Sequence, residues 1–407
     1  MRRAYAHGVS SKPSPAGSLD DVVRAVRHAL DGGPVYAPRP RPADAAPPPP
    51  GTALVLRTSG STGNPREVAL SAAALRASAE ATHERLGGPG RWLLVLPPTH
   101  VAGIQVVART VVAGTEVGGG TLESFTPEGF AALAGDFLTA GARAYVSVVP
   151  TQLHRLVVAA EDGEPAGLAA LARFDGVLVG GAATPGPLLS HARAAGVRVV
   201  TTYGMSETSG GCVYDGVPLA GVHVRLAEGT GDGAGVVELS GPTLAEGYVD
   251  DPAATAAAFR TDPDGTRWFR TSDLGRLDGN RLTVLGRADD VVVTGGVNVA
   301  PAAVEEVITE HLAARGTPGE ACVVGVPDDE WGQAVVAVVT GGVDRIAPVD
   351  PAVLAELRAA VAARLGSAAA PRRAYAVGAL PQRGPGKIDR AGVRRSVVQA
   401  EREPVRP

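Results

Sequence analysis

Between residues 53 and about 203, short apolar runs alternate with longer segments whose apolar residues recur at helical spacing. The strand-like runs are Ala53–Leu56, Trp92–Leu96, Ala144–Val149, Val177–Val179 and Val197–Thr201, and two helical segments are Ser71–Leu86 and Thr151–Ala160. This alternation predicts an α/β fold with a mainly parallel sheet that is covered by helices on both faces. Ligands are expected at the carboxyl ends of the strands.

The chain changes character after Gly204. Glycine-rich turns then separate short strands, Val236–Ser240 and Arg281–Leu285, which predicts a small β-rich section. From about residue 289 a compact α+β module is expected, with strands Val291–Thr294, Ala321–Val326 and Ala334–Val339 and helices Ala302–Ala314 and Ala352–Leu365. A chain of 407 residues is long enough for two or three hydrophobic cores.

The first 52 residues are expected to form a helix followed by a linker. Ser18 and Asp21 form a capping box, and the apolar side chains after them recur on one face, which predicts a helix over residues 18–30. Seven of the thirteen residues from 38 to 50 are proline. Proline fixes φ and removes the amide donor, so this stretch predicts an extended spacer or a surface crossing. The expected domains are therefore residues 1–52, 53–286 and 287–400.

Composition excludes several classes of protein. Hydrophobic residues make up 45% of the chain and charged residues 20%, which is typical of a globular protein. A net charge of −4 argues against a nucleic-acid partner. Two cysteines, Cys212 and Cys322, cannot build a disulfide framework, and no metal-binding cysteine spacing occurs. No signal peptide and no membrane-spanning run is recognised, so the expected location is the cytoplasm.

A hydroxyl-rich loop, Thr58–Arg66, is the most distinctive local motif in the sequence. Its first six residues hold four hydroxyls and two glycines, whose side chains and amides can converge on one anion. The loop follows a predicted strand and precedes a helical segment, which favours phosphate binding. It differs from the GxxxxGK[ST] nucleotide loop in its spacing and in lacking the final Lys-Ser/Thr pair. A flexible surface loop is the alternative interpretation.

Four further clusters lie where functional loops are expected. They are Val179–Ala182, Thr202–Thr208 with Tyr203 and Glu207, Arg270–Gly275 with Asp273, and Pro385–Asp389 with Lys387. A tyrosine can stack on a base, one carboxylate can hold a divalent cation, and another suits the hydroxyls of a ribose. Each residue taken singly also has a structural interpretation, as a core tyrosine, a helix-start charge, a turn former or a solvated lysine. Their joint occurrence in this order favours the functional interpretation over the structural one.

These motifs together resemble the superfamily of acyl- and aryl-CoA synthetases, luciferases and peptide-synthetase adenylation domains, over residues 53–395. The resemblance implies an ATP-dependent enzyme that forms an acyl-adenylate with Mg²⁺ and then uses coenzyme A as acceptor. It implies ATP binding by Thr58, Ser59, Gly60, Ser61, Thr62, Gly63, Arg66, Gly180, Gly181, Ala182, Tyr203, Gly204, Ser206, Asp273 and Arg287.

The resemblance also implies particular roles. Tyr203 lies on adenine, Glu207 binds magnesium, and Asp273 binds the ribose hydroxyls with Arg287 nearby. Lys387 bridges the substrate carboxylate and the α-phosphate. Asp289, in Gly286–Asp290, is the hinge of a small mobile C-terminal domain.

By the same resemblance, Gly295 and Gly296 are expected to line the tunnel for the pantetheine arm of coenzyme A.

Three departures from the family pattern stand out. Arg66 and Glu67 replace the usual Lys-Gly pair, Ser206 replaces a threonine, and the region before the phosphate loop is much shorter than usual. A cation and a hydroxyl are retained at the first two sites, so activity is expected.

The substrate is predicted from residues 203–216 and the compact length, which resemble short bacterial o-succinylbenzoate–CoA ligases of menaquinone biosynthesis. Such a substrate keeps a second carboxylate after activation, so a cation is expected in the acyl pocket. His100, where the family's acyl pocket begins, and Arg109 are the candidates. An uncharged pocket wall and an ordinary surface position are their respective alternatives.

Two other functions remain open at this stage. One is another adenylating enzyme, either a general acyl- or aryl-CoA ligase or one that loads a carrier-protein thiol. The other is a non-catalytic nucleotide-binding relative. The presence of Glu207, Asp273 and Lys387 together argues against the second alternative.

Overall fold

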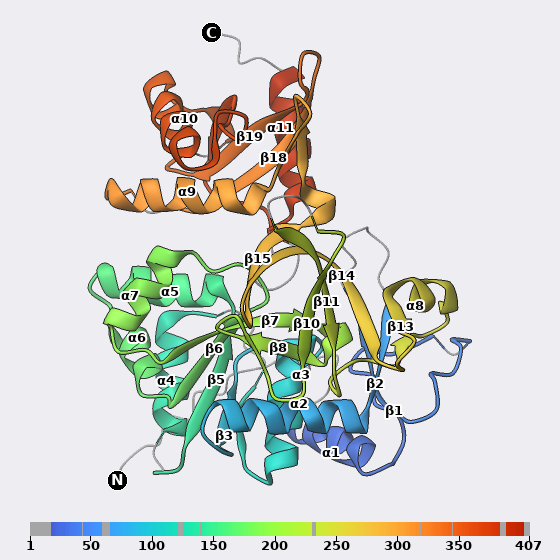
Figure 1. The fold of residues 1–407 in the computed structure, drawn as a ribbon. Coiled ribbons are helices and arrows are strands. Elements are labelled where there is room, and N and C mark those ends of the chain that lie inside the picture. The colour runs from blue at the N-terminus through green and yellow to red at the C-terminus, as the bar shows by residue number, and fades with distance from the viewer. Residues whose placement is uncertain are drawn as a thin grey trace, which may run out of the picture.

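The computed structural model of the chain forms a large N-terminal domain and a smaller C-terminal domain, drawn in orange to red in Figure 1. The residues it describes are 18–42, 44–58, 66–120, 125–138, 141–229, 233–317, 319–343, 345–382 and 388–402.

A seven-stranded sheet forms the centre of the large domain. Its strands are β3 (Arg91–Leu94), β4 (Val117–Gly119), β5 (Ala144–Val148), β6 (Gly176–Gly180), β7 (Val199–Met205), β8 (Gly210–Tyr214) and β9 (Val217–Pro218). Their order is β4-β3-β5-β6-β7-β8-β9. The pairs from β4 to β7 are parallel, whereas β8 and β9 are antiparallel additions. The predicted mainly parallel sheet is thus confirmed.

Helices cover both faces of this sheet, as expected. One face carries α4 (Pro127–Phe137), α5 (Pro150–Glu161), α6 (Ala166–Ala172) and α7 (Gly186–Ala194), and the other carries α1 (Leu19–Leu30), α2 (Ala72–Arg85) and α3 (Val101–Ala113). Successive side chains of a strand point to opposite faces. Accordingly, Leu93 packs into the core under α4 and α5, while Trp92 and Leu94 pack into the core under α2 and α3.

The N-terminal helix begins as the capping signal predicts. The Ser18 hydroxyl accepts a hydrogen bond from the Asp21 amide, and the Asp21 carboxylate accepts one from the Ser18 amide. Val22 and Val26 are fully buried in the core of the large domain. After this helix, residues 38–42 and 44–50 form neither helix nor strand.

The structure corrects the pairing expected for the first strand. β1 (Thr52–Arg57) and β2 (Glu67–Ser71) are antiparallel and form a separate three-stranded sheet with β12 (Gly247–Tyr248). The hydroxyl-rich loop therefore joins two strands of a hairpin and does not lead directly into a helix. An apolar run does not specify its partner strand, and β2 ends on Ser71, the residue that caps α2.

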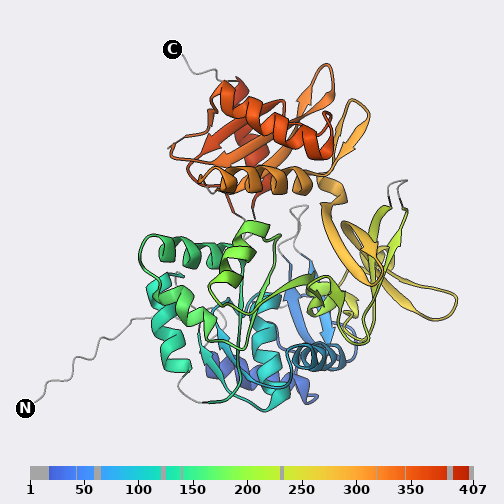
Figure 2. The same cartoon turned by 60° about the vertical axis from the view of Figure 1, so that its left-hand side comes forward.

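An antiparallel sheet follows the central sheet in the chain and forms the predicted β-rich section. It contains β10 (His223–Ala227), β11 (Ala234–Ser240), β13 (Phe259–Thr261), β14 (Arg267–Asp278) and β15 (Arg281–Arg287), with α8 (Pro252–Ala258) beside it. Figure 2 shows this sheet as a lobe at the side of the large domain. The long strand β14 pairs with both β11 and β15, so it can bring Asp273 toward the central sheet.

The C-terminal domain has the predicted α+β character. The short hairpin β16 (Val292–Thr294) and β17 (Val297–Val299) precedes a sheet of β18 (Ala321–Asp328), β19 (Gly332–Thr340), β20 (Ala347–Pro348) and β21 (Arg373–Val377). Helices α9 (Pro301–Ala314) and α10 (Pro351–Leu365) cover one face of this sheet, and α11 (Arg390–Arg402) covers the other. The proposed domain limits at residues 52 and 286 stay predictions.

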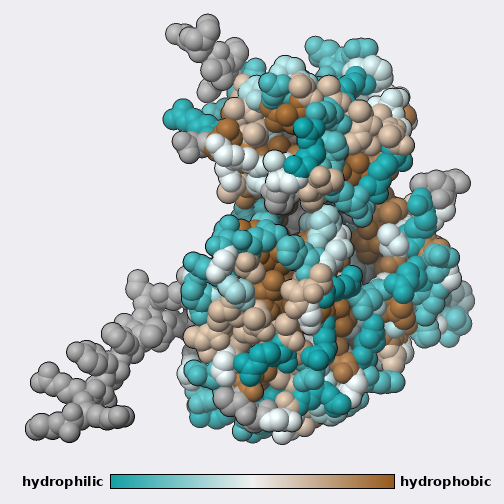
Figure 3. All heavy atoms as spheres, turned by 90° about the vertical axis from the view of Figure 1, so that its left-hand side faces the viewer, coloured by the Kyte–Doolittle hydropathy of each residue, from teal (hydrophilic) through white to brown (hydrophobic). Residues whose placement is uncertain are grey.

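The two domains meet where α9 packs beside α7 and β15. In Figure 3 the surface narrows and is hollowed between them. None of the helices in the described part of the chain is long and apolar enough to cross a membrane.

Candidate active site

Tyr203 and Asp273 meet although they lie on different sheets. Tyr203 lies near the carboxyl end of β7, and its hydroxyl donates a hydrogen bond of 2.7 Å to Asp273 Oδ2 on β14. Burial, together with the Asp273 charge, raises the pKa of Tyr203 well above its usual value. The phenol therefore stays protonated and can act as a donor. Arg287 lies opposite Asp273 in the pairing of β14 with β15.

Glu207 lies two residues after the end of β7, in the short helix η1 (Ser206–Thr208). Its Oε1 accepts a hydrogen bond of 2.9 Å from the Tyr248 hydroxyl. Burial, with the Glu207 charge, raises the pKa of Tyr248. The guanidinium of Arg66 lies 5.0 Å from the centre of the Tyr248 ring. Thus Tyr248 links the predicted magnesium ligand to the end of the phosphate loop.

Only the two ends of the predicted phosphate loop are described. The Thr58 amide donates to the Arg66 carbonyl at 2.8 Å, and the Arg66 amide donates to Thr58 Oγ1 at 3.2 Å. Ser59, Gly60, Ser61, Thr62 and Gly63 lie outside the described residues, as does Lys387.

The unusual Glu67, next to this loop, is held by two arginines. Arg41 Nε donates to Glu67 Oε2 at 2.8 Å, and Arg57 donates to Glu67 Oε1 at 3.1 Å. The Glu67 side chain is 16% exposed, so its carboxylate is largely shielded from solvent. Glu67 therefore ties the proline-rich segment to both strands of the hairpin.

Two of the predicted ATP-binding glycines are required by the packing of the strands themselves. A Cβ on Gly204 would lie 2.1 Å from the carbonyl oxygen of Gly210, and a Cβ on Gly180 would lie 2.1 Å from Thr202 Oγ1. Gly181 has a φ of +88°, and Ala182, which follows it, is exposed. The absence of a side chain at Gly180 and Gly204, which was predicted to admit a ligand, thus also lets the neighbouring strands pack closely.

The predicted hinge carries a bidentate ion pair. Arg287 Nε and Nη2 donate to Asp289 Oδ1 and Oδ2, both at 2.7 Å. These hydrogen bonds raise the pKa of Arg287. Asp289 belongs to the short helix η2 (Ala288–Asp290), which leads from the large domain into β16. Arg287 is therefore placed between the predicted ribose ligand Asp273 and the predicted hinge.

Gly295 and Gly296 form the turn between β16 and β17. Their φ angles are +56° and +79°, which favour glycine. A Cβ on Gly295 would lie 2.6 Å from the ring of Trp331, whereas one on Gly296 would meet nothing within 4 Å. The turn is on the C-terminal domain, so the structure does not bring these two glycines into the group around Tyr203.

The two predicted substrate residues occupy different environments. His100 directly precedes α3, and its Nε2 lies 3.3 Å from Nη2 of Arg39. Arg109 is only 3% exposed, so its alternative interpretation as ordinary surface is wrong. Its guanidinium lies 4.9 Å from the centre of the Trp92 ring and donates to the Tyr214 hydroxyl at 3.2 Å. Trp92 is near the start of β3, whereas His100 follows the end of β3, so Arg109 and His100 are not brought together.

Arg109 was misjudged because α3 is enclosed. Residues 103–110 are all buried, with α1, α2 and β3 packed around the helix. A single arginine in an apolar run gives no sign of this enclosure. Sequence reasoning also missed the contacts of Tyr248 with Glu207 and of Arg39 with His100, because Tyr248 lies in a two-residue strand and Arg39 in a proline-rich segment interpreted as a linker.

The donor set fits one magnesium ion shared with phosphates. Within the described ranges no group of three or more His, Cys, Asp or Glu side chains could form a complete metal cage. Glu207 instead offers a single hard carboxylate ligand at the carboxyl end of the sheet. Mg²⁺ in phosphate-binding enzymes is held in this way, by one or two carboxylates plus substrate oxygens.

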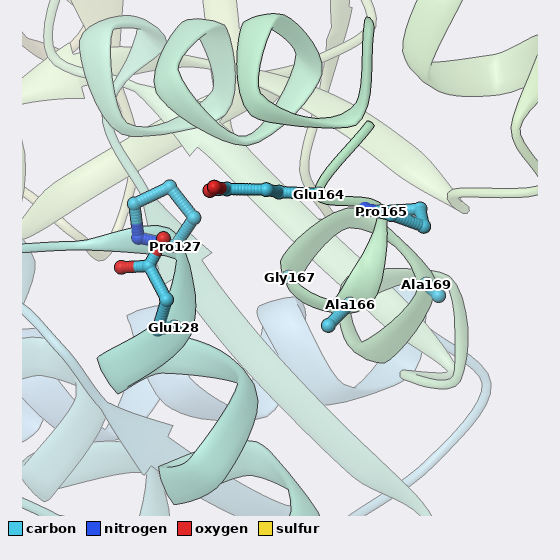
Figure 4. Close-up of a pocket in the computed structure, with 7 residues that line it drawn as sticks. All are labelled: Pro127, Glu128, Glu164, Pro165, Ala166, Gly167 and Ala169. Atoms are coloured by element: carbon cyan, nitrogen blue, oxygen red, sulfur yellow. The ribbon is translucent and has the colours of Figure 1, made fainter. Parts of the chain in front are cut away.

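A cavity of about 360 Å³ lies elsewhere, between the starts of α4 and α6 (Figure 4). It is lined by Pro127, Glu128, Glu164, Pro165, Ala166, Gly167 and Ala169. None of the predicted site residues lines it, and its wall is mostly apolar.

The fold, with its large N-terminal and smaller C-terminal domain, matches that of adenylate-forming enzymes, and comparison with known families agrees. The family model "AMP-binding enzyme" matches residues 8–249, and "AMP-binding enzyme C-terminal domain" matches residues 301–387. The chain belongs to the AMP-binding enzyme family.

Among its relatives, "Probable 2-succinylbenzoate–CoA ligase" of Mycobacterium tuberculosis (strain CDC 1551 / Oshkosh) is 45% identical over 358 residues, covering 86% of each chain. The 2-succinylbenzoate–CoA ligase of Geobacillus kaustophilus is 33% identical, covering 86% of this chain and 70% of that one. The structure of the o-succinylbenzoate coenzyme A synthetase of Bacillus subtilis in complex with ATP and magnesium superposes with a TM-score of 0.67. It is 26% identical and covers 84% of this chain and 69% of that chain.

Proposed function

We propose that this protein is an ATP-dependent 2-succinylbenzoate–CoA ligase that works through an acyl-adenylate. The observation that carries the enzyme class is the 2.7 Å contact between Tyr203 and Asp273 with Glu207 close behind on the chain. The proposed substrate is supported by the 45% identity to a relative of that name and by the resemblance at residues 203–216. We place the reaction in menaquinone biosynthesis and in the cytoplasm.

In the first half-reaction, a carboxylate oxygen of the acid attacks the α-phosphorus of ATP. A new bond forms between that oxygen and the α-phosphorus, and the bond from the α-phosphorus to the bridging oxygen breaks, so that pyrophosphate leaves with the electron pair. The nucleophile is already ionised, so no general base is needed. Catalysis is then mostly positioning and charge neutralisation.

The residues of the large domain would bind and orient the nucleotide. The Tyr203 ring would lie against adenine, while Asp273 and Arg287 would hold the ribose. Bound magnesium would neutralise phosphate charge, and Glu207, fixed by Tyr248, would be its protein ligand. Thr58 to Gly63 and Arg66 would surround the β- and γ-phosphates.

In the second half-reaction, the thiol of coenzyme A attacks the acyl carbon of the mixed anhydride. A thioester bond forms, AMP leaves, and the thiol proton is released. For this step we propose that the C-terminal domain turns about Asp289, so that Lys387 leaves and the face with Gly295 and Gly296 approaches. One site would thus serve two reactions in turn.

The test is ATP-dependent pyrophosphate release with a panel of acids. The panel contains 2-succinylbenzoate, benzoate, fatty acids and amino acids, and the measured quantity is kcat/KM for each. We expect 2-succinylbenzoate to be the best substrate. A fatty acid or an amino acid that is better by about tenfold, a difference of roughly 1.4 kcal/mol, would contradict the substrate while leaving the enzyme class intact. No release with any acid would favour a non-catalytic relative.

A further inference from the structure

The proline-rich segment before β1 is anchored on both sides of Arg39. On one side, Tyr36 pairs with β1: its amide donates to the Ala53 carbonyl at 2.9 Å, and its carbonyl accepts from the Val55 amide at 3.0 Å. On the other side, Arg41 binds the Glu67 carboxylate at 2.8 Å and the Ala46 carbonyl at 2.6 Å. The segment is therefore fixed to the hairpin that carries the phosphate loop.

The backbone between these anchors has little freedom. Pro38 and Pro40 flank Arg39, and the proline ring locks φ. Pro38 is buried, and Ala37 packs on the small core of Val55, Ala69 and Val249. The position of Arg39 is thus determined by its neighbours, while its side chain is exposed.

Arg39 reaches the residue at which the predicted acyl pocket begins. Its Nη2 lies 3.3 Å from His100 Nε2. A guanidinium can only donate, so this contact is a hydrogen bond in the His100 tautomer whose Nε2 accepts. Val101, the next residue, lies beside Gly210, which pairs with Met205 of β7. His100 is therefore followed in the chain by a residue that packs on β8, the neighbour of the strand that carries Tyr203.

Among the described residues, Arg39 differs from its neighbouring arginines in having no carboxylate partner. The nearby arginines Arg41, Arg57 and Arg66 each form an ion pair with a carboxylate. Arg39 forms none with any residue that the structure describes. A guanidinium has five N–H donors and can bind a carboxylate through two parallel hydrogen bonds. A cation that lies beside His100, where the acyl pocket is predicted to begin, and that pairs with no carboxylate of the described residues is suited to an anionic group on the substrate.

We propose that Arg39 is a substrate-binding residue that recognises the second carboxylate of a dicarboxylic aromatic acid. This inference rests on the proposed function, because only a diacid keeps a carboxylate after activation. It assigns the expected cation to the N-terminal segment, in place of Arg109, which lies in the core.

The test compares 2-succinylbenzoate with two analogues that each lack one carboxylate, 4-oxo-4-phenylbutyrate and 2-butanoylbenzoate. The analogue that still supports pyrophosphate release carries the activated carboxylate, and it serves as the monoacid reference. In Arg39→Gln we expect kcat/KM for the diacid to fall by about 10-fold or more, the usual range for a charge-assisted hydrogen bond. The fall should come from a higher KM for the diacid, and kcat/KM for the monoacid should change by less than about twofold.

Two further variants separate recognition from structure. Arg39→Lys keeps the charge and should recover part of the diacid preference, although it lacks the planar fork. Arg24→Gln removes an exposed arginine of α1 and should leave kcat/KM for both acids unchanged. Equal losses for both acids in Arg39→Gln, or an unchanged ratio, would overturn the inference. Absence of diacid turnover by the wild type would overturn the proposed function, and the inference with it.

Discussion

The contact of 2.9 Å between the Tyr248 hydroxyl and Glu207 shows how one carboxylate is oriented after β7. If Glu207 binds magnesium, its charge is what matters, because glutamine has nearly the same shape. We expect Glu207→Gln to lower the rate of adenylation by at least about 10²-fold, a loss of roughly 2.7 kcal/mol in transition-state stabilisation. The measurement is pyrophosphate release at saturating magnesium.

The matched control at this site is Tyr248→Phe, which removes the hydroxyl but keeps the carboxylate. Its effect should be smaller, below about 10-fold, because it removes one hydrogen bond to a charged group that remains in place. Unchanged turnover in Glu207→Gln would indicate a purely structural role for the carboxylate.

At the residue scale, the sequence was most informative for side chains that belong to a recognisable chemical motif. Tyr203 was predicted to lie on adenine and Asp273 to bind the ribose, and the structure brings the two side chains into contact, although these roles stay predictions. Their distance in space could not be predicted, since 70 residues separate them. Tyr248 was missed because a tyrosine in a two-residue strand has no pattern around it.

At the scale of helices and strands, the packing of α2 against β3 and α3 buries the imidazole of His83. His83 Nε2 accepts a hydrogen bond of 3.2 Å from Trp92 Nε1, and burial together with the Arg109 charge lowers the pKa of His83 to about 4. In the unfolded chain the pKa is near 6.5. Between these two values the unfolded state binds a proton that the native state does not, so the free energy of unfolding falls as pH is lowered.

We therefore expect the wild type to lose stability, on the order of 1 kcal/mol, between pH 7 and pH 5 through His83 alone. His83→Gln keeps an acceptor for Trp92 and should show a shallower pH dependence. The measurement is denaturant unfolding at both pH values. The same substitution at the exposed His223 is the control and should leave the slope unchanged. Equal slopes in the wild type and His83→Gln would show that His83 does not cause the dependence.

The hairpin of β1 and β2 shows where the prediction of elements fails. Residues 53–56 were correctly interpreted as a strand, but the parallel pairing expected for them was wrong. Five residues of β2 lie directly before α2, without a glycine or proline to separate them. Helix and strand boundaries of the C-terminal domain were predicted more closely, because Pro301 and Pro351 mark the starts of α9 and α10.

For the whole molecule, the proposed cycle requires the C-terminal domain to take two positions. Lys387, outside the described residues, would be delivered to the site for adenylation only. We expect Lys387→Ala to lower pyrophosphate release by about 10²-fold or more, as for the loss of a key electrostatic contact. The same variant, supplied with prepared acyl-adenylate and coenzyme A, should form thioester at nearly the wild-type rate.

A comparable loss in both half-reactions would mean that Lys387 stays in the site throughout, provided that a thermal melt shows the variant to be folded. A loss in neither half-reaction would contradict the role given to this lysine. The two assays together distinguish domain rotation from a fixed site.

The central claim, that the protein joins an acid to coenzyme A through an acyl-adenylate, is tested most directly by the products. The purified protein is incubated with ATP, magnesium and 2-succinylbenzoate, with and without coenzyme A, and the nucleotides and acyl products are separated. We predict AMP, pyrophosphate and 2-succinylbenzoyl-CoA in equal amounts with coenzyme A, and enzyme-bound acyl-adenylate without it. Formation of ADP and phosphate, or thioester without AMP, would contradict the account.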